Sequence, residues 1–84
     1  MIKEGAQNSL LLLDILLAKT VDEINQFEDV KYEVVLDTKF MKKISVLLNQ
    51  IYQDRSAGNF KAAIRKVIFL HKMAVRERRR LDDC

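Results

Sequence analysis

The chain contains no proline and only two glycines among its 84 residues, so long stretches can form helices without interruption. Aromatic residues make up only 7% of the sequence, while leucine and charged residues are frequent, which favours helices over a β-sandwich. A chain of this length forms one domain and buries only about 60–65% of its surface on folding. That leaves little room for both a core and an enclosed active site.

Apolar residues recur every three or four positions in three segments, which predicts amphipathic helices over residues 8–27, 29–57 and 60–80. The connections between these segments are short. We therefore predict an all-α fold, a three-helix up-down-up antiparallel bundle, as a single domain over residues 1–84.

Particular residues mark the expected helix ends. Asn8 or Ser9 is expected to cap the first helix, because their side-chain oxygens accept hydrogen bonds from free N–H groups. Gly58 can adopt the left-handed conformation that ends a helix, and Asn59 is expected to cap the third helix. The Asp37–Thr38 step leaves open a kink or a split in the second helix.

Each predicted helix has one apolar stripe that faces the core when residues are placed at 100° steps. The expected stripe residues are Leu10, Leu13, Leu17, Val21 and Ile24, with Thr20 and Phe27 at the edge; then Tyr32, Leu36, Phe40, Ile44, Leu47, Leu48 and Ile51; and finally Phe60, Ala63, Ile64, Val67, Ile68, His71, Ala74 and Val75.

Few polar residues converge in a way that indicates catalysis. His71 is the only histidine and lies on an apolar stripe, so we interpret it as a core-edge residue with one bonded ring nitrogen. The single cysteine, Cys84, excludes an internal disulfide and a cysteine-based zinc site, and we expect it in a solvated tail. Asp14 borders the first stripe and is expected to reach water or pair with a base. We predict no catalytic residues, no metal and no cofactor.

The longest apolar run, Leu10–Ala18, is interrupted by Asp14 and is far shorter than the roughly 20 residues that span a bilayer. No signal peptide or arginine-rich transit segment is visible. We therefore expect no membrane association and a cytoplasmic location, or the mitochondrial matrix if the chain is a processed piece.

Charge is distributed unevenly along the chain. Residues 1–60 hold seven lysines and arginines against nine acidic residues, whereas residues 61–84 hold eight against three. Cations near the end of a helix match its dipole, but they can also bind phosphates, so a small basic nucleic-acid-binding regulator is the alternative function. The candidate residues for binding nucleic acid or an acidic partner are Arg65, Lys66, Arg76, Arg78, Arg79 and Arg80.

Several large apolar residues point away from the predicted core. Leu11, Leu12 and Ile15 do so on the first helix, and Phe69 and Met73 do so on the third. Parallel first and third helices would bring the two groups to the same height, where they form one exposed patch if the helices are suitably rotated. Such a patch is typical of a protein-binding surface, for a partner or for a second copy of the chain.

Three segments resemble a known family in matching order. Leu11–Gln26, with its Val-Asp-Glu-Ile pattern, resembles the first helix of the C-terminal domain of HscB-type J-protein co-chaperones. Gly58–Ala63 and Ile68–Met73 are similar to the opening and the middle of that family's last helix. The run from Gly58 to Ile64 also resembles the inter-helix turn of tetratricopeptide-like and microtubule-interacting-and-trafficking hairpins.

The resemblance implies a non-enzymatic module that docks the scaffold protein of iron–sulfur cluster assembly. Glu23 agrees with an acidic contact position of the family, whereas Leu16 and Lys19 stand at two others. The His-Pro-Asp loop of the family's J-domain does not occur in this sequence, which has no proline. The expected partner-binding residues are Leu11, Leu12, Ile15, Glu23, Phe69 and Met73.

Overall fold

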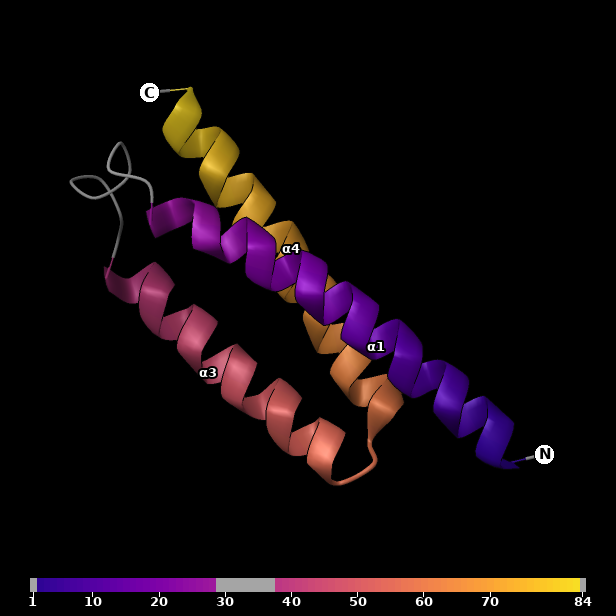
Figure 1. Ribbon diagram of the computed structural model, residues 1–84. Coiled ribbons are helices and arrows are strands. Elements are labelled where there is room, and N and C mark those ends of the chain that lie inside the picture. The colour runs from indigo at the N-terminus through magenta and orange to yellow at the C-terminus, as the bar shows by residue number, and fades with distance from the viewer. Residues whose placement is uncertain (1, 29–37, 84) are drawn as a thin grey trace.

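The structure, a computed structural model, describes residues 2–28 and 38–83. Its elements are α1 (Ile2–Asn25), a short 3-10 helix (Gln26–Glu28), α3 (Thr38–Ser56) and α4 (Phe60–Asp82) (Figure 1). These segments contain no strand. The predicted all-α class is confirmed.

The helices run up, down and up. In Figure 1, α1 and α4 point in the same direction, and Thr20 of α1 lies against His71 of α4. α3 runs the opposite way (Figure 1), and Asp54 near its end pairs with Lys66 near the start of α4. The structure therefore agrees with the predicted three-helix bundle, in which α4 packs against both α1 and α3.

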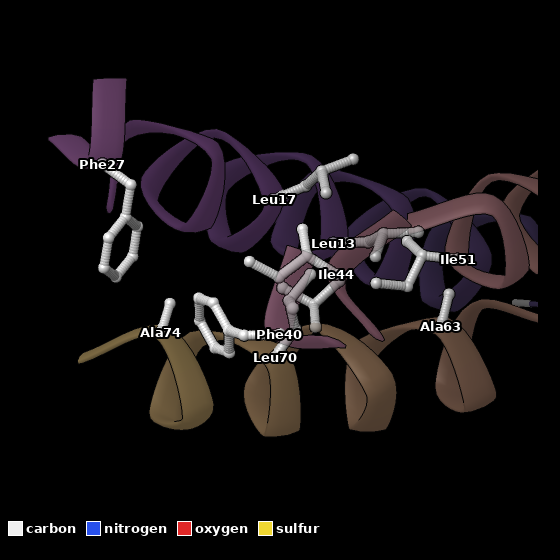
Figure 2. Packing of buried hydrophobic residues seen from close by; sticks show 10 residues of the cluster. Leu13, Leu17, Phe27, Phe40, Ile44, Ile51, Ala63, Leu70 and Ala74 are labelled. Carbon is white, nitrogen blue, oxygen red and sulfur yellow. The ribbon is translucent and has the colours of Figure 1, made fainter. Parts of the chain in front are cut away.

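All three helices contribute to one apolar core (Figure 2). The rings of Phe27 and Phe40 meet edge to face, with centroids 5.4 Å apart, where the chain leaves α1 and enters α3. Burying a large apolar side chain contributes about 1.5–3 kcal/mol, so this cluster is the main source of stability. The buried apolar residues are Leu13, Leu17, Phe27, Phe40, Ile44, Ile51, Ala63, Val67, Leu70 and Ala74.

The predicted start of the first helix is wrong. α1 begins at Ile2, so Asn8 and Ser9 lie inside the helix instead of capping it. The preceding residues include lysine, glutamate, alanine and glutamine, which favour helix, and Gly5 alone costs only about 1 kcal/mol there. At the other end of the chain, α4 continues to Asp82, past the predicted end at residue 80.

The turn between α3 and α4 follows the predicted glycine signal. Gly58 has a φ of 82°, and its N–H donates to the carbonyl of Arg55 at 3.2 Å. The N–H of Asn59 donates to the carbonyl of Asp54 at 2.8 Å, which completes a Schellman motif. The predicted side-chain cap by Asn59 is wrong: its ψ of 62° lies outside the extended region usual for a cap, and its side chain makes no capping hydrogen bond.

Part of the second predicted helix lies outside the described residues. This applies to residues 29–37, with Tyr32 and Leu36, and to the Asp37–Thr38 step, where the sequence leaves open a kink or a split. Cys84 is also outside them. From Thr38 onward, α3 agrees with the predicted segment.

The core stripe of α4 differs from the predicted one by a rotation. Ile68 was expected in the core but is 41% exposed, whereas Leu70 was not expected there and is fully buried. The physical reason is that α4 packs against two helices at once, so its buried face lies between them. That face is centred on Val67 and Leu70 and not on the side of His71.

Candidate functional site

The first candidate surface lies on α1. Leu11, Leu12 and Ile15 are 61%, 48% and 47% exposed, and we call these three residues the α1 apolar face. Figure 1 shows that the first turns of α1 extend past the loop between α3 and α4. Because Leu11 and Ile15 are one helical turn apart, their side chains share one side of the helix.

The second candidate surface lies between α3 and α4. Phe69 is 58% exposed, whereas Met73 is half-buried against the core. Both residues line an open groove of about 410 Å³ together with side chains of α3. We call this the α3/α4 groove, and its lining residues are Lys42, Lys43, Val46, Leu47, Phe69 and Met73.

The structure does not bring these two surfaces together. Ile68 borders a different groove, between α1 and α4, where it lies with Leu16 and Lys19. Phe69 is the next residue along the helix and lies on the side of α4 that faces α3. The expected single patch is therefore two surfaces, because the rotation of α4 turns Phe69 away from α1.

Glu23 is engaged within the chain. Its Oε1 lies 2.8 Å from Arg78 Nη2 in an ion pair, and its Oε2 accepts a hydrogen bond from Gln26 Nε2 at 3.1 Å. Arg78 also donates to the side-chain oxygen of Gln26. The Arg78 Nε is buried without a hydrogen-bond partner in the described part of the chain. This cluster joins the ends of α1 and α4 and makes Glu23 and Arg78 less available to a partner.

Two further basic candidates are also used internally. Lys66 Nζ lies 2.6 Å from a carboxylate oxygen of Asp54, and Arg80 pairs with Glu77 one turn away. The predicted cations therefore do not form one continuous free surface. The candidates that are exposed and form no ion pair within residues 2–28 and 38–83 are Arg65, Arg76 and Arg79.

Asp14 pairs with a base, which is one of its two expected arrangements. Arg55 donates to both carboxylate oxygens, from Nε at 2.9 Å and from Nη2 at 3.2 Å, and so links α1 to α3. The hydrogen bond from Arg55 lowers the pKa of Asp14, against a smaller opposing effect of burial. The same contact raises the pKa of Arg55.

His71 lies half-buried beside α1. The hydroxyl of Thr20 donates to the carbonyl of Leu16 at 2.8 Å and lies 3.4 Å from His71 Nδ1. Across the described segments, no group of three or more His, Cys, Asp or Glu side chains could hold a metal ion. None of the helices seen there is long and apolar enough to cross a membrane.

Sequence reasoning missed the contribution of α3. Val46 is 54% exposed, and together with Lys42 and Lys43 it forms one wall of the α3/α4 groove. Val46 lies two positions after the buried Ile44, on the opposite side of the helix, so its angle could have identified it.

Comparisons with protein-family models, curated proteins and solved structures find no match to this chain.

Proposed function

We propose that the chain is a non-enzymatic protein–protein interaction module, acting as an adaptor or co-chaperone. The observation that carries this proposal is the exposure of large apolar side chains outside the apolar core that the described residues form. Leu11, Ile15 and Phe69 are each about half exposed or more, although burying such a side chain contributes about 1.5–3 kcal/mol. A protein partner that covers them recovers this free energy.

The first partner to test is the scaffold protein of iron–sulfur cluster assembly. The ordered resemblance to the HscB-type C-terminal domain supports this choice, and three of the matched contact positions form the α1 apolar face. We therefore propose the α1 apolar face as the docking surface for the scaffold. This function places the chain in the cytoplasm or in the mitochondrial matrix.

The alternative function, nucleic-acid binding through α4, has weaker support. Lys66, Arg78 and Arg80 already pair with carboxylates of the same chain. Each of these cations would have to give up its partner to bind a phosphate. Among the six candidates, Arg65, Arg76 and Arg79 remain as exposed cations that form no ion pair within the described residues.

The test is a calorimetric titration of the chain with the iron–sulfur scaffold protein. We expect Leu12→Ala and Ile15→Ala to weaken binding about tenfold, because truncating a central apolar contact commonly costs more than about 1 kcal/mol. Val46→Ala removes an exposed apolar side chain from another surface and serves as the matched control. Far-UV circular dichroism verifies that each variant is folded. Unchanged affinity in folded α1 variants would reject this face, and the absence of binding by the wild type would reject the scaffold.

A further inference from the structure

The α3/α4 groove is a second docking surface with its own chemistry. We propose that it binds an acidic amphipathic helix of a partner protein. This inference rests on the proposed function of the chain as a protein-interaction module, and it names the partner chemistry of a surface separate from the α1 apolar face.

The groove offers apolar contacts at two depths. Leu47 and Met73 are half-buried and pack against the core, while Val46 and Phe69 are 54% and 58% exposed at its edges. A cavity of about 150 Å³ holds a benzene molecule. The groove, at about 410 Å³, therefore has room for more than one large side chain. Side chains spaced one turn apart on a helix fill a groove of this kind.

Cations of α3 line the groove, and cations of α4 lie on the same side of their helix as Phe69. Lys42 and Lys43 line the groove on the α3 side. Arg65 precedes Phe69 by one turn and Arg76 follows it by two turns, so both lie on its side of α4. With Asp54 beside Lys66 in antiparallel helices, Lys42 and Lys43 lie level with positions 78 and 77 of α4, one to two residues past Arg76.

The two helices that form the groove are strongly basic as a whole. α3 carries four lysines and arginines against one acidic residue, and α4 carries eight against two. The carboxylates of Asp54 and Glu77 are already paired with cations of α4. α1 has the opposite balance, with two lysines against four acidic residues. A helix with glutamate or aspartate beside its apolar stripe complements the α3/α4 side of the bundle.

The same features disfavour other occupants. A second copy related by a two-fold axis would place one cationic groove against another, which brings like charges together. A nucleic acid would meet Val46 and Phe69 at the centre of the surface, where phosphate binding needs cations. The apolar face of an acidic amphipathic helix can pack against the apolar centre of the groove, and its carboxylates can pair with the cations at the edge.

The experiment is an NMR titration of the full isotope-labelled chain with a synthetic helical peptide of about 18 residues, or five turns. The peptide carries leucine at one-turn spacing on one face and glutamate elsewhere. We expect the methyl signals of Val46, Leu47 and Met73 to shift, while those of Leu11 and Ile15 stay in place. One control peptide replaces glutamate by lysine and a second replaces leucine by glutamine, and neither is expected to bind.

Matched variants test the two components separately. Phe69→Ala is expected to weaken peptide binding about tenfold, whereas Leu11→Ala, another exposed apolar truncation, leaves the affinity unchanged. Lys43→Glu is expected to weaken binding about fivefold, and Lys19→Glu, the same charge change on α1, has little effect. Circular dichroism verifies the fold of all four variants.

Several results would overturn the inference. These are the absence of shifts in the groove, shifts confined to the α1 apolar face, equal binding of the lysine peptide, and displacement of the acidic peptide by a short DNA duplex. Chemical-shift changes in the groove that appear when the chain alone is concentrated would assign the surface to a second copy.

If the scaffold protein binds through Leu12 while the peptide leaves the groove signals unchanged, the proposed function stands and this inference fails. If the scaffold does not bind but the peptide does, the scaffold assignment fails and the groove assignment stands.

Discussion

Two adjacent residues of α4 should respond very differently to truncation. Leu70 is fully buried and Phe69 is 58% exposed, although they are neighbours in the sequence. Replacing a buried leucine by alanine costs about 2–5 kcal/mol, since both transfer free energy and packing are lost. We expect Leu70→Ala to lower the free energy of unfolding by about 3 kcal/mol. Phe69→Ala should lower it by less than about 1 kcal/mol, because most of that side chain is already in water.

Urea unfolding followed by circular dichroism measures both changes. With a slope of about 1.5 kcal/mol per molar urea, Leu70→Ala shifts the midpoint by about 2 M. This is a large fraction of the total stability of a small domain, which is about 5–15 kcal/mol. If Phe69→Ala costs as much as Leu70→Ala, the assigned rotation of α4 is wrong and Phe69 belongs to the core. The apolar contact surface in the α3/α4 groove would then be lost.

Three further predictions concern the contacts that hold the helices in place. Arg55 lowers the pKa of Asp14 in the folded chain. The ion pair therefore stabilises the fold at a pH above the usual pKa of aspartate, and this stabilisation is lost as the pH falls through the lowered pKa. Asp14→Asn should therefore reduce the urea midpoint at pH 7 and have little effect near pH 2, and an equal effect at both would contradict the assignment. Gly58→Ala should lower the free energy of unfolding, measured by thermal denaturation, by about 1 kcal/mol. A Cβ at this position meets no neighbouring atom, but an alanine is strained at the positive φ. An unchanged stability would indicate a turn of another kind. Glu23→Ala should lower stability by about 1 kcal/mol by removing the partner of Arg78, and a variant with unchanged unfolding would show that Glu23 is free for external contacts.

The existence of α1, α3 and α4 could be predicted because the signals for helices are local. Apolar spacing identified α1, α3 and α4, and the Gly58 signal placed the turn before α4. The start of α1 was missed because capping residues such as Asn8 also occur inside helices when the preceding residues favour helix. Local patterns thus predict that a helix exists better than they predict where it begins.

The rotation of α4 could not be predicted from its own sequence. Its apolar residues cover a wide arc that includes both Ile68 and Leu70, and only packing against α1 and α3 decides which of them is buried. The same rotation decides whether Phe69 shares a surface with Leu11. The exposure of Leu11 and of Phe69 followed from their angles, but whether the two side chains share one surface is a tertiary property.

The ion pairs between helices were also beyond the reach of the sequence. Arg78 and Glu23 are far apart in the chain, and so are Arg55 and Asp14. A basic run near the end of a helix indicates free cations only when no carboxylate of another helix lies within reach. Two of the six predicted cations of α4, Lys66 and Arg78, pair with carboxylates of another helix.

Hydroxyl-radical footprinting of the free chain, with oxidation quantified residue by residue, tests most directly whether large apolar side chains face outward. We expect Leu11 and Phe69 to be oxidised at rates near those of an unfolded peptide, while Leu13 and Leu70 are strongly protected. These rates should not change on dilution. Protection of Leu11 and Phe69 equal to that of Leu70 in the monomer would contradict the account.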